Sequence, residues 1–112
     1  MSARSLRARN AIRAAEVLAQ AAPAVAARCR DALPGEVVVA EVAADLRFAG
    51  VRSLPRHALH ASLARSSPGA WVVTFARHTS LEEIERRCFN LGRTAYRRWK
   101  LSARLDRRSA TS

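Results

Sequence analysis

Basic side chains recur at helical spacing near the C-terminal end of the chain. Arg93, Arg97, Lys100, Arg104 and Arg107 follow one another at intervals of four, three, four and three residues. On a helix, this spacing places all five on one face. Like charges so arranged weaken an isolated helix by a few tenths of a kcal/mol per pair, so the row is best understood if it meets phosphates. A solvated helix face is the structural alternative.

The charge of the whole chain points the same way. Among 112 residues, 20 are Lys or Arg and 9 are Asp or Glu, which gives a net charge of +11 and an isoelectric point near 11.7. All the basic residues but Lys100 are arginines, whose guanidinium forks match phosphate oxygens and guanine edges. This balance favours nucleic acid as the partner, with an acidic protein or membrane surface as the alternatives.

The residue types that catalysis or metal binding would need are sparse and scattered. Cys29 and Cys88 form no CxxC pair, and the histidines are spread over positions 57, 60 and 78. A Ser-His-acid arrangement and a glycine-rich phosphate loop are also missing from the pattern. We therefore expect no enzyme activity, no metal and no cofactor, and two reduced, buried thiols.

The hydropathy pattern favours a cytoplasmic location. No stretch approaches the ~18 uninterrupted apolar residues of a membrane span, and the start of the chain lacks the apolar centre of a secretory signal. The Arg-, Ser- and Ala-rich beginning, with Glu16 as its one acid, is also typical of an organellar transit peptide.

The first half of the chain predicts two helices and one ambiguous segment. Residues 5–21 are helix-forming, and Pro23 should kink the helix or begin a second one that runs to about Leu33. Pro34-Gly35 marks a turn. In the segment 36–46 three consecutive valines favour a strand, whereas the spacing of its apolar residues favours a helix, which we take as the prediction.

The middle of the chain predicts a short helix, a loop and a core segment. Ser53-Leu54-Pro55 is a plausible helix start, with Leu59 and Leu63 on one face. Residues 66–69, Ser-Ser-Pro-Gly, form the clearest loop. The segment 70–76 carries the densest large apolar patch and fits either a buried helix or a strand.

Two helices separated by a turn are predicted for the last third. Thr79 with Glu82, and Ser80 with Glu83, form overlapping capping boxes that mark a helix start. Asn90-Leu91-Gly92 supplies residues that tolerate a tight turn. A basic amphipathic helix should follow over residues 93–107.

These residues carry a family resemblance. The run Thr79-Ser-Leu-Glu-Glu-Ile-Glu-Arg-Arg-Cys, followed by Leu91-Gly-Arg-Thr-Ala-Tyr-Arg-Arg-Trp, resembles the helix-turn-helix of region 4 of bacterial sigma factors and of related phage and bacterial regulators. The similarity covers about residues 53–105. It implies that Arg93, Thr94, Arg97 and Arg98 lie nearest the DNA groove, while the residues farther along meet phosphate, namely Lys100, Arg104 and Arg107.

Together these patterns predict a mostly helical domain with a C-terminal helix-turn-helix and a short strand at 36–42 or 70–76 as an alternative. Residues 1–50 would form a support or oligomerisation element, residues 53–108 the binding region, and residues 109–112 a disordered tail. The expected function is a DNA-binding transcription regulator of bacterial or phage type, with a homodimer as one arrangement. The alternatives are an adaptor that binds RNA polymerase or a replication machine through the Arg-rich helix, and an RNA-binding structural protein.

Overall fold

The fold combines a three-stranded antiparallel sheet with a long helical pair. The computed structural model describes residues 2–111, with side chains described for residues 2–105. The elements in chain order are α1 (Ala3–Gln20), α2 (Ala22–Asp31), β1 (Glu36–Val42), β2 (Phe48–Pro55), the 3-10 helix η1 (Arg56–Ala58), α3 (Leu59–Ala64), β3 (Trp71–Ala76) and α4 (Leu81–Thr111). This mixed α/β architecture contradicts the mostly helical fold expected from the sequence.

The helix favoured for residues 36–46 is wrong, because most of this segment is the central strand of the sheet. β1 pairs antiparallel with β2 on one side, from Glu36 opposite Pro55 to Val42 opposite Phe48, and with β3 on the other. Val38, Val39 and Val42 are fully buried. A central strand covered on both faces needs apolar residues at consecutive positions, which hides the alternation that would have identified it.

The other expectations for the first three quarters of the chain are confirmed only in part. The break near Pro23 is confirmed, since α1 ends at Gln20 and α2 begins at Ala22 with the proline in its first turn. The strand alternative for residues 70–76 is also confirmed by β3. The helix start at Ser53–Pro55 is wrong, because these residues end β2.

The predicted helix-turn-helix is wrong: within the described residues a single helix occupies this region. α4 runs unbroken through Asn90-Leu91-Gly92, and Gly92 is not among the glycines with positive φ, which are Gly35, Gly50 and Gly69. The predicted start of the helix is confirmed: the Ser80 Oγ accepts a hydrogen bond from the Glu83 amide at 3.2 Å. Thr79 does not complete its own capping box, because its hydroxyl donates to the carbonyl oxygen of Ala76.

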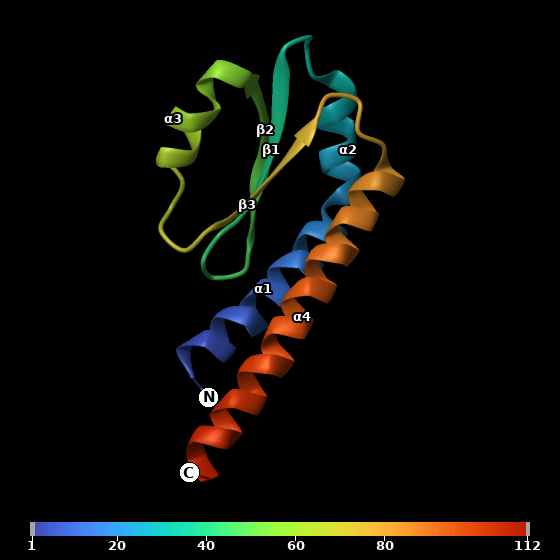
Figure 1. The fold of residues 1–112 in the computed structure, drawn as a ribbon. Helices are drawn as coiled ribbons and strands as arrows, with labels where there is room; N and C mark the ends of the chain where they lie inside the picture. Colours follow the sequence, from blue (N-terminus) through green and yellow to red (C-terminus); the bar gives the residue numbers. More distant parts are fainter. Residues whose placement is uncertain (1, 112) are drawn as a thin grey trace.

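Packing against α1 explains why α4 continues. The two helices run antiparallel along each other and make the most extensive contact in the molecule, so both chain ends lie at the same end of the fold (Figure 1). Gly92 faces Ala15 at the crossing, where a Cβ added to the glycine would lie 3.7 Å from the Ala15 Cβ. The tail predicted for 109–112 lies outside the residues whose side chains are described.

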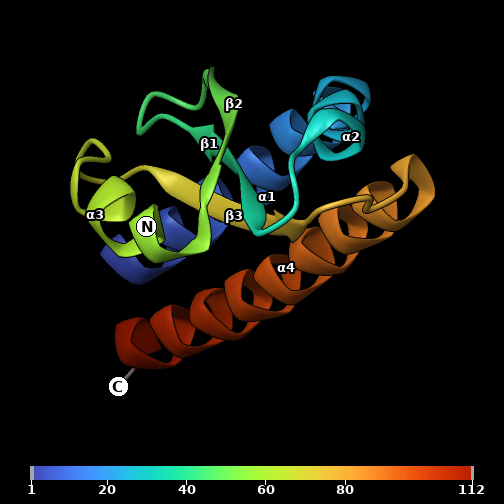
Figure 2. The same ribbon diagram turned by 90° about the horizontal axis from the view of Figure 1, so that it is seen from above.

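The core lies between the sheet and the helices. Val38, Val42 and Phe75 project from the sheet onto α1, α2 and the first turns of α4, where they meet Val25 and Ile84. Residues from both 1–50 and 53–108 therefore build one core. α3 lies across the sheet from α2, as two views show (Figures 1 and 2).

Candidate nucleic-acid interface

A row of basic residues follows the outer face of α4. Arg93, Arg97, Lys100 and Arg104 are all exposed, and Arg86, also exposed, lies on the same line about two turns closer to the helix start. We call these five residues the outer ridge. At 1.5 Å per residue the ridge is about 27 Å long. Arg107, the fifth member expected from the sequence, has a side chain outside the described residues.

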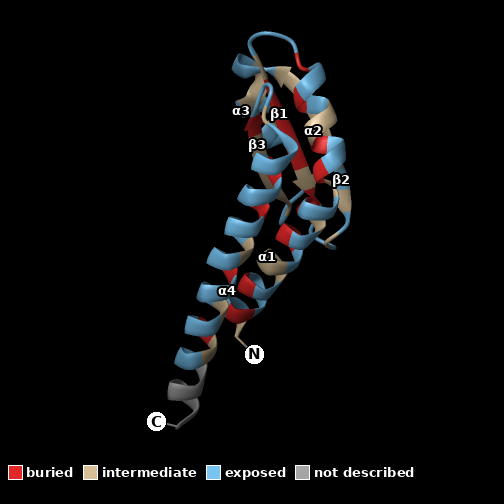
Figure 3. Ribbon diagram, turned by 90° about the vertical axis from the view of Figure 1, so that its right-hand side faces the viewer, coloured by how far each residue is buried: buried red, intermediate tan, exposed pale blue. Residues whose placement is uncertain are grey.

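The ridge points outward because the opposite face of α4 is buried. Ile84, Cys88, Ala95 and Ser102 are buried at spacings of four and seven residues, on the face that meets α1 and the sheet. The burial pattern makes this two-sided character visible along the helix (Figure 3). The basic face is therefore free to meet a partner without any change in the fold.

Thr94 and Arg98 belong to a different surface from the rest of the predicted set. Both line a groove between α1 and α4 on the side of β3, beside Arg4 and Arg7 of α1. Each follows Arg93 or Arg97 by one residue and is therefore rotated from it by about 100° around the helix axis. The structure thus keeps Arg93, Arg97, Lys100 and Arg104 together and separates Thr94 and Arg98 from them.

The ridge is free of internal neutralisation. Among the residues whose side chains are described, the ion pairs are Arg13–Glu16, Arg47–Asp45 and Arg52–Glu41, and none includes a ridge residue. Glu16 and Glu85 line a shallow pocket together with Arg93 and Arg97, but neither forms an ion pair with them. The cations of the ridge therefore depend on solvent ions or a partner for neutralisation.

Two exposed aromatic rings border the ridge. Phe89 is 65% exposed and Tyr96 is 47% exposed. The Arg93 guanidinium lies 5.9 Å from the Phe89 ring centre, and the Lys100 ammonium lies 5.5 Å from that of Tyr96. Sequence reasoning assigned Phe89 to the neighbourhood of a turn and so missed it. The seven-residue spacing of Phe89 and Tyr96 could have identified the pair, because it places both rings on one side of a continuous helix.

Trp99 helps to fix this aromatic edge. Its ring centre lies 5.8 Å from that of Tyr96, and the planes are tilted by 47°. Trp99 is half-buried, so it holds one side of Tyr96 while the other side stays accessible. Trp99 thus supports the aromatic edge from the side of the core.

The two cysteines have the properties of core residues. Cys29 and Cys88 are buried and free. Burial raises the pKa of both thiols; the positive charge of Arg87 opposes the rise at each. A thiol whose pKa is raised remains protonated at neutral pH, which makes it a poor nucleophile and metal ligand.

The polar cluster on the far face of the sheet also has a structural explanation. The Glu41 carboxylate accepts hydrogen bonds from Arg52 at 3.4 Å and from the Ser66 hydroxyl at 2.9 Å, and Arg52 donates to the Ser62 hydroxyl. These bonds attach α3 and its loop to the sheet. Groups that satisfy one another in this way are held in place for packing rather than presented to a substrate.

No helix within the described residues is long and apolar enough to cross a membrane. The same part of the chain holds no group of three or more His, Cys, Asp or Glu side chains that could bind a metal ion. Comparison with protein-family models, with curated proteins and with solved structures finds no match to this chain.

Proposed function

We propose that this chain binds nucleic acid through the outer ridge of α4, with duplex DNA as the first candidate ligand. The observation that carries the proposal is the ridge itself: five exposed cations on one helix face, none of which forms an ion pair among the described side chains. The transcription-regulator role was expected from a resemblance to helix-turn-helix proteins. Because α4 is continuous, that motif no longer supports the role. The proposal is therefore limited to binding.

The dimensions of α4 suit a duplex. A helix with its side chains is about 10–12 Å across, close to the width of the DNA major groove, which is about 12 Å. α1 covers only the rear of α4, so the ridge can enter the groove or lie along the phosphates beside it. Contacts to phosphate supply affinity without sequence information, and an Arg that reaches a guanine edge would add sequence preference.

The salt dependence of binding tests the ridge quantitatively. If all five cations meet phosphates, the slope of log affinity against log salt should be about −4.5, since each contact contributes about −0.9. Changing Arg93 and Arg97 together to Ala should bring the slope to about −2.7. Fluorescence anisotropy with a labelled duplex at several salt concentrations measures both slopes.

A matched variant separates the ridge from net charge. Arg56→Ala with Arg65→Ala also removes two exposed cations, but from the region of α3, away from α4. This control should keep the original slope. If both double variants lose the same affinity, binding depends on overall charge; if neither loses affinity, the ridge is not the interface.

Single-stranded nucleic acid is the second candidate, and the exposed Phe89 and Tyr96 favour it specifically. Proteins that bind single strands combine a basic surface with aromatic rings on which bases stack, worth about 1–3 kcal/mol per base. Changing both rings to Ala should then weaken binding of single-stranded DNA or RNA while duplex affinity stays constant. Equal losses for all three ligands would argue against stacking as their role.

A further inference from the structure

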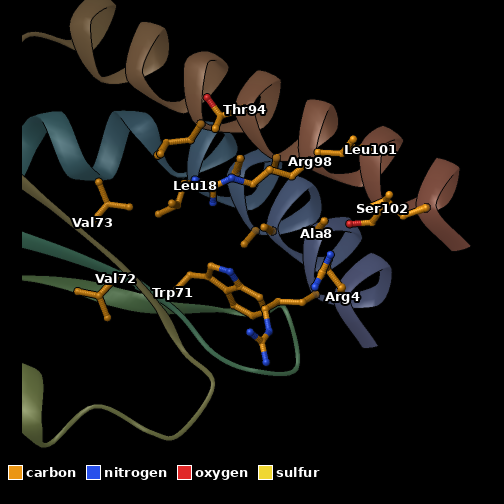
Figure 4. A pocket seen from close by; sticks show the side chains of 17 residues that line it. Arg4, Ala8, Leu18, Trp71, Val72, Val73, Thr94, Arg98, Leu101 and Ser102 are labelled. Atoms are coloured by element: carbon orange, nitrogen blue, oxygen red, sulfur yellow. The ribbon is translucent and has the colours of Figure 1, made fainter. Parts of the chain in front are cut away.

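A groove runs along the helical pair on the side that faces β3, separate from the outer ridge. Its volume is about 560 Å³. We call it the α1–α4 groove. Its floor consists of small side chains from α1, including Ala8, Ala11 and Ala14, and Trp71 at the beginning of β3 closes one side (Figure 4).

The wall formed by α4 is apolar and open to solvent. Leu91, Leu101 and Leu105 all line the groove, and they are 42%, 55% and 37% exposed. On the same side of the helix Ala95 is buried and Trp99 is half-buried, whereas the leucines are open to solvent. Exposed leucines that share a groove with a tryptophan are typical of an interaction surface.

The rim of the groove is positively charged. Arg4, Arg7 and Arg98 line it and are exposed, and none of the three forms an ion pair within the described side chains. Among the residues whose side chains are described, no acid lines it. A partner that covers the leucines would displace solvent ions from these arginines. It would therefore need negative charge of its own at the rim to neutralise them.

The length and floor of the groove fit a helix. The lining residues extend from Arg4 to Leu18 on α1 and from Leu91 to Leu105 on α4, so each side is about 21 Å long, or about four helical turns. Alanines in the floor allow another backbone to approach closely. A helix with apolar residues every three or four positions would place them between the leucine wall and Trp71.

We propose that the α1–α4 groove binds an acidic amphipathic helix of a partner protein. The apolar face of that helix covers Leu91, Leu101 and Leu105, and its flanking carboxylates pair with the arginines of the rim. A second copy of this chain fits poorly, because its net charge is +11 and its own long helix is basic. Thr94 and Arg98 thereby act in partner binding rather than at the nucleic-acid surface.

A synthetic peptide serves as the probe. It should be a four-turn helix with leucines at positions i, i+3, i+4 and i+7 and glutamates on both flanks. Two controls share its length: a scrambled peptide of the same composition, and one with lysines in place of the glutamates. Titration into the full chain, followed by amide chemical shifts, should show saturable binding of the acidic peptide alone, with changes along the groove.

Variants then locate the site. Leu101→Glu and Arg98→Glu both alter exposed groove residues and should each weaken peptide binding by about tenfold or more, a loss typical of a central interface residue. Leu63→Glu changes an exposed leucine on α3 and should have no effect. The Arg93 and Arg97 double variant should keep its affinity for the peptide, which distinguishes this site from the proposed DNA surface.

Three outcomes would overturn the proposal. Saturation by the scrambled peptide as well would show that the chain binds any polyanion. Absence of saturable binding would remove the groove as a helix site. Sedimentation that shows a dimer, dissociated by Leu101→Glu, would assign the groove to a second copy of the chain.

Discussion

Replacement of Gly92 by Ala tests the continuity of α4 directly. Gly92 lies within the helix, and an added Cβ would meet the Ala15 Cβ at 3.7 Å, an ordinary van der Waals distance. The substitution therefore removes the flexibility of a helical glycine without creating a clash. In the helix-turn-helix expected from the sequence, the same glycine would serve a turn, where a left-handed conformation disfavours alanine.

The expected gain can be worked from these facts. Ala is favoured over Gly in a helix interior by about 0.8–1.0 kcal/mol, and partial burial of the methyl group against Ala15 adds up to about 0.5 kcal/mol. The free energy of unfolding should thus rise by about 1–1.5 kcal/mol. For a domain of this size the melting temperature should rise by about 4–7 °C.

Urea unfolding followed by circular dichroism measures the change. Gly69→Ala is the matched control, because Gly69 has a φ of +80° and an added Cβ would lie 3.2 Å from the Ala44 Cβ. This control should lose about 1–2 kcal/mol. If Gly92→Ala instead destabilised the protein by a similar amount, the helix would be interrupted at Gly92 and the argument for a continuous outer ridge would fail.

Three further predictions concern stability. Ser80→Ala removes the hydroxyl that accepts from the Glu83 amide and should cost about 0.5–2 kcal/mol in urea unfolding, whereas an unchanged midpoint would show that the cap is unimportant. Ile84→Ala empties a fully buried position and should cost about 2–5 kcal/mol; a loss below 1 kcal/mol would contradict its place in the core. Because the pKa values of Cys29 and Cys88 are raised in the folded protein, the unfolded thiols ionise first, so the two thiols should lower the stability as the pH rises toward 9 and beyond. The double Ala variant should show a weaker fall between pH 8 and 10, and an identical fall would assign it to other groups.

The sequence by itself determined the features that depend on local chemistry. The break at Pro23 follows from a missing amide, and the start of α4 follows from the Ser80 hydroxyl three residues before Glu83. The common face of Arg93, Arg97, Lys100 and Arg104 follows from the helical period, which is the same in a short helix and a long one. These features need no knowledge of distant contacts.

Only the tertiary structure decided the choices that local propensity left balanced. Residues 36–42 became a strand because β2 and β3 pair with both of its edges, and these pairings span many positions of the chain. Gly92 stayed helical because α1, about 77 residues earlier at Ala15, packs across it and needs a small residue there. The same packing turned Arg98 toward the groove and left Arg97 on the outer ridge. Neighbouring arginines with equal intrinsic chemistry thus acquired different surroundings from a contact that sequence spacing does not encode.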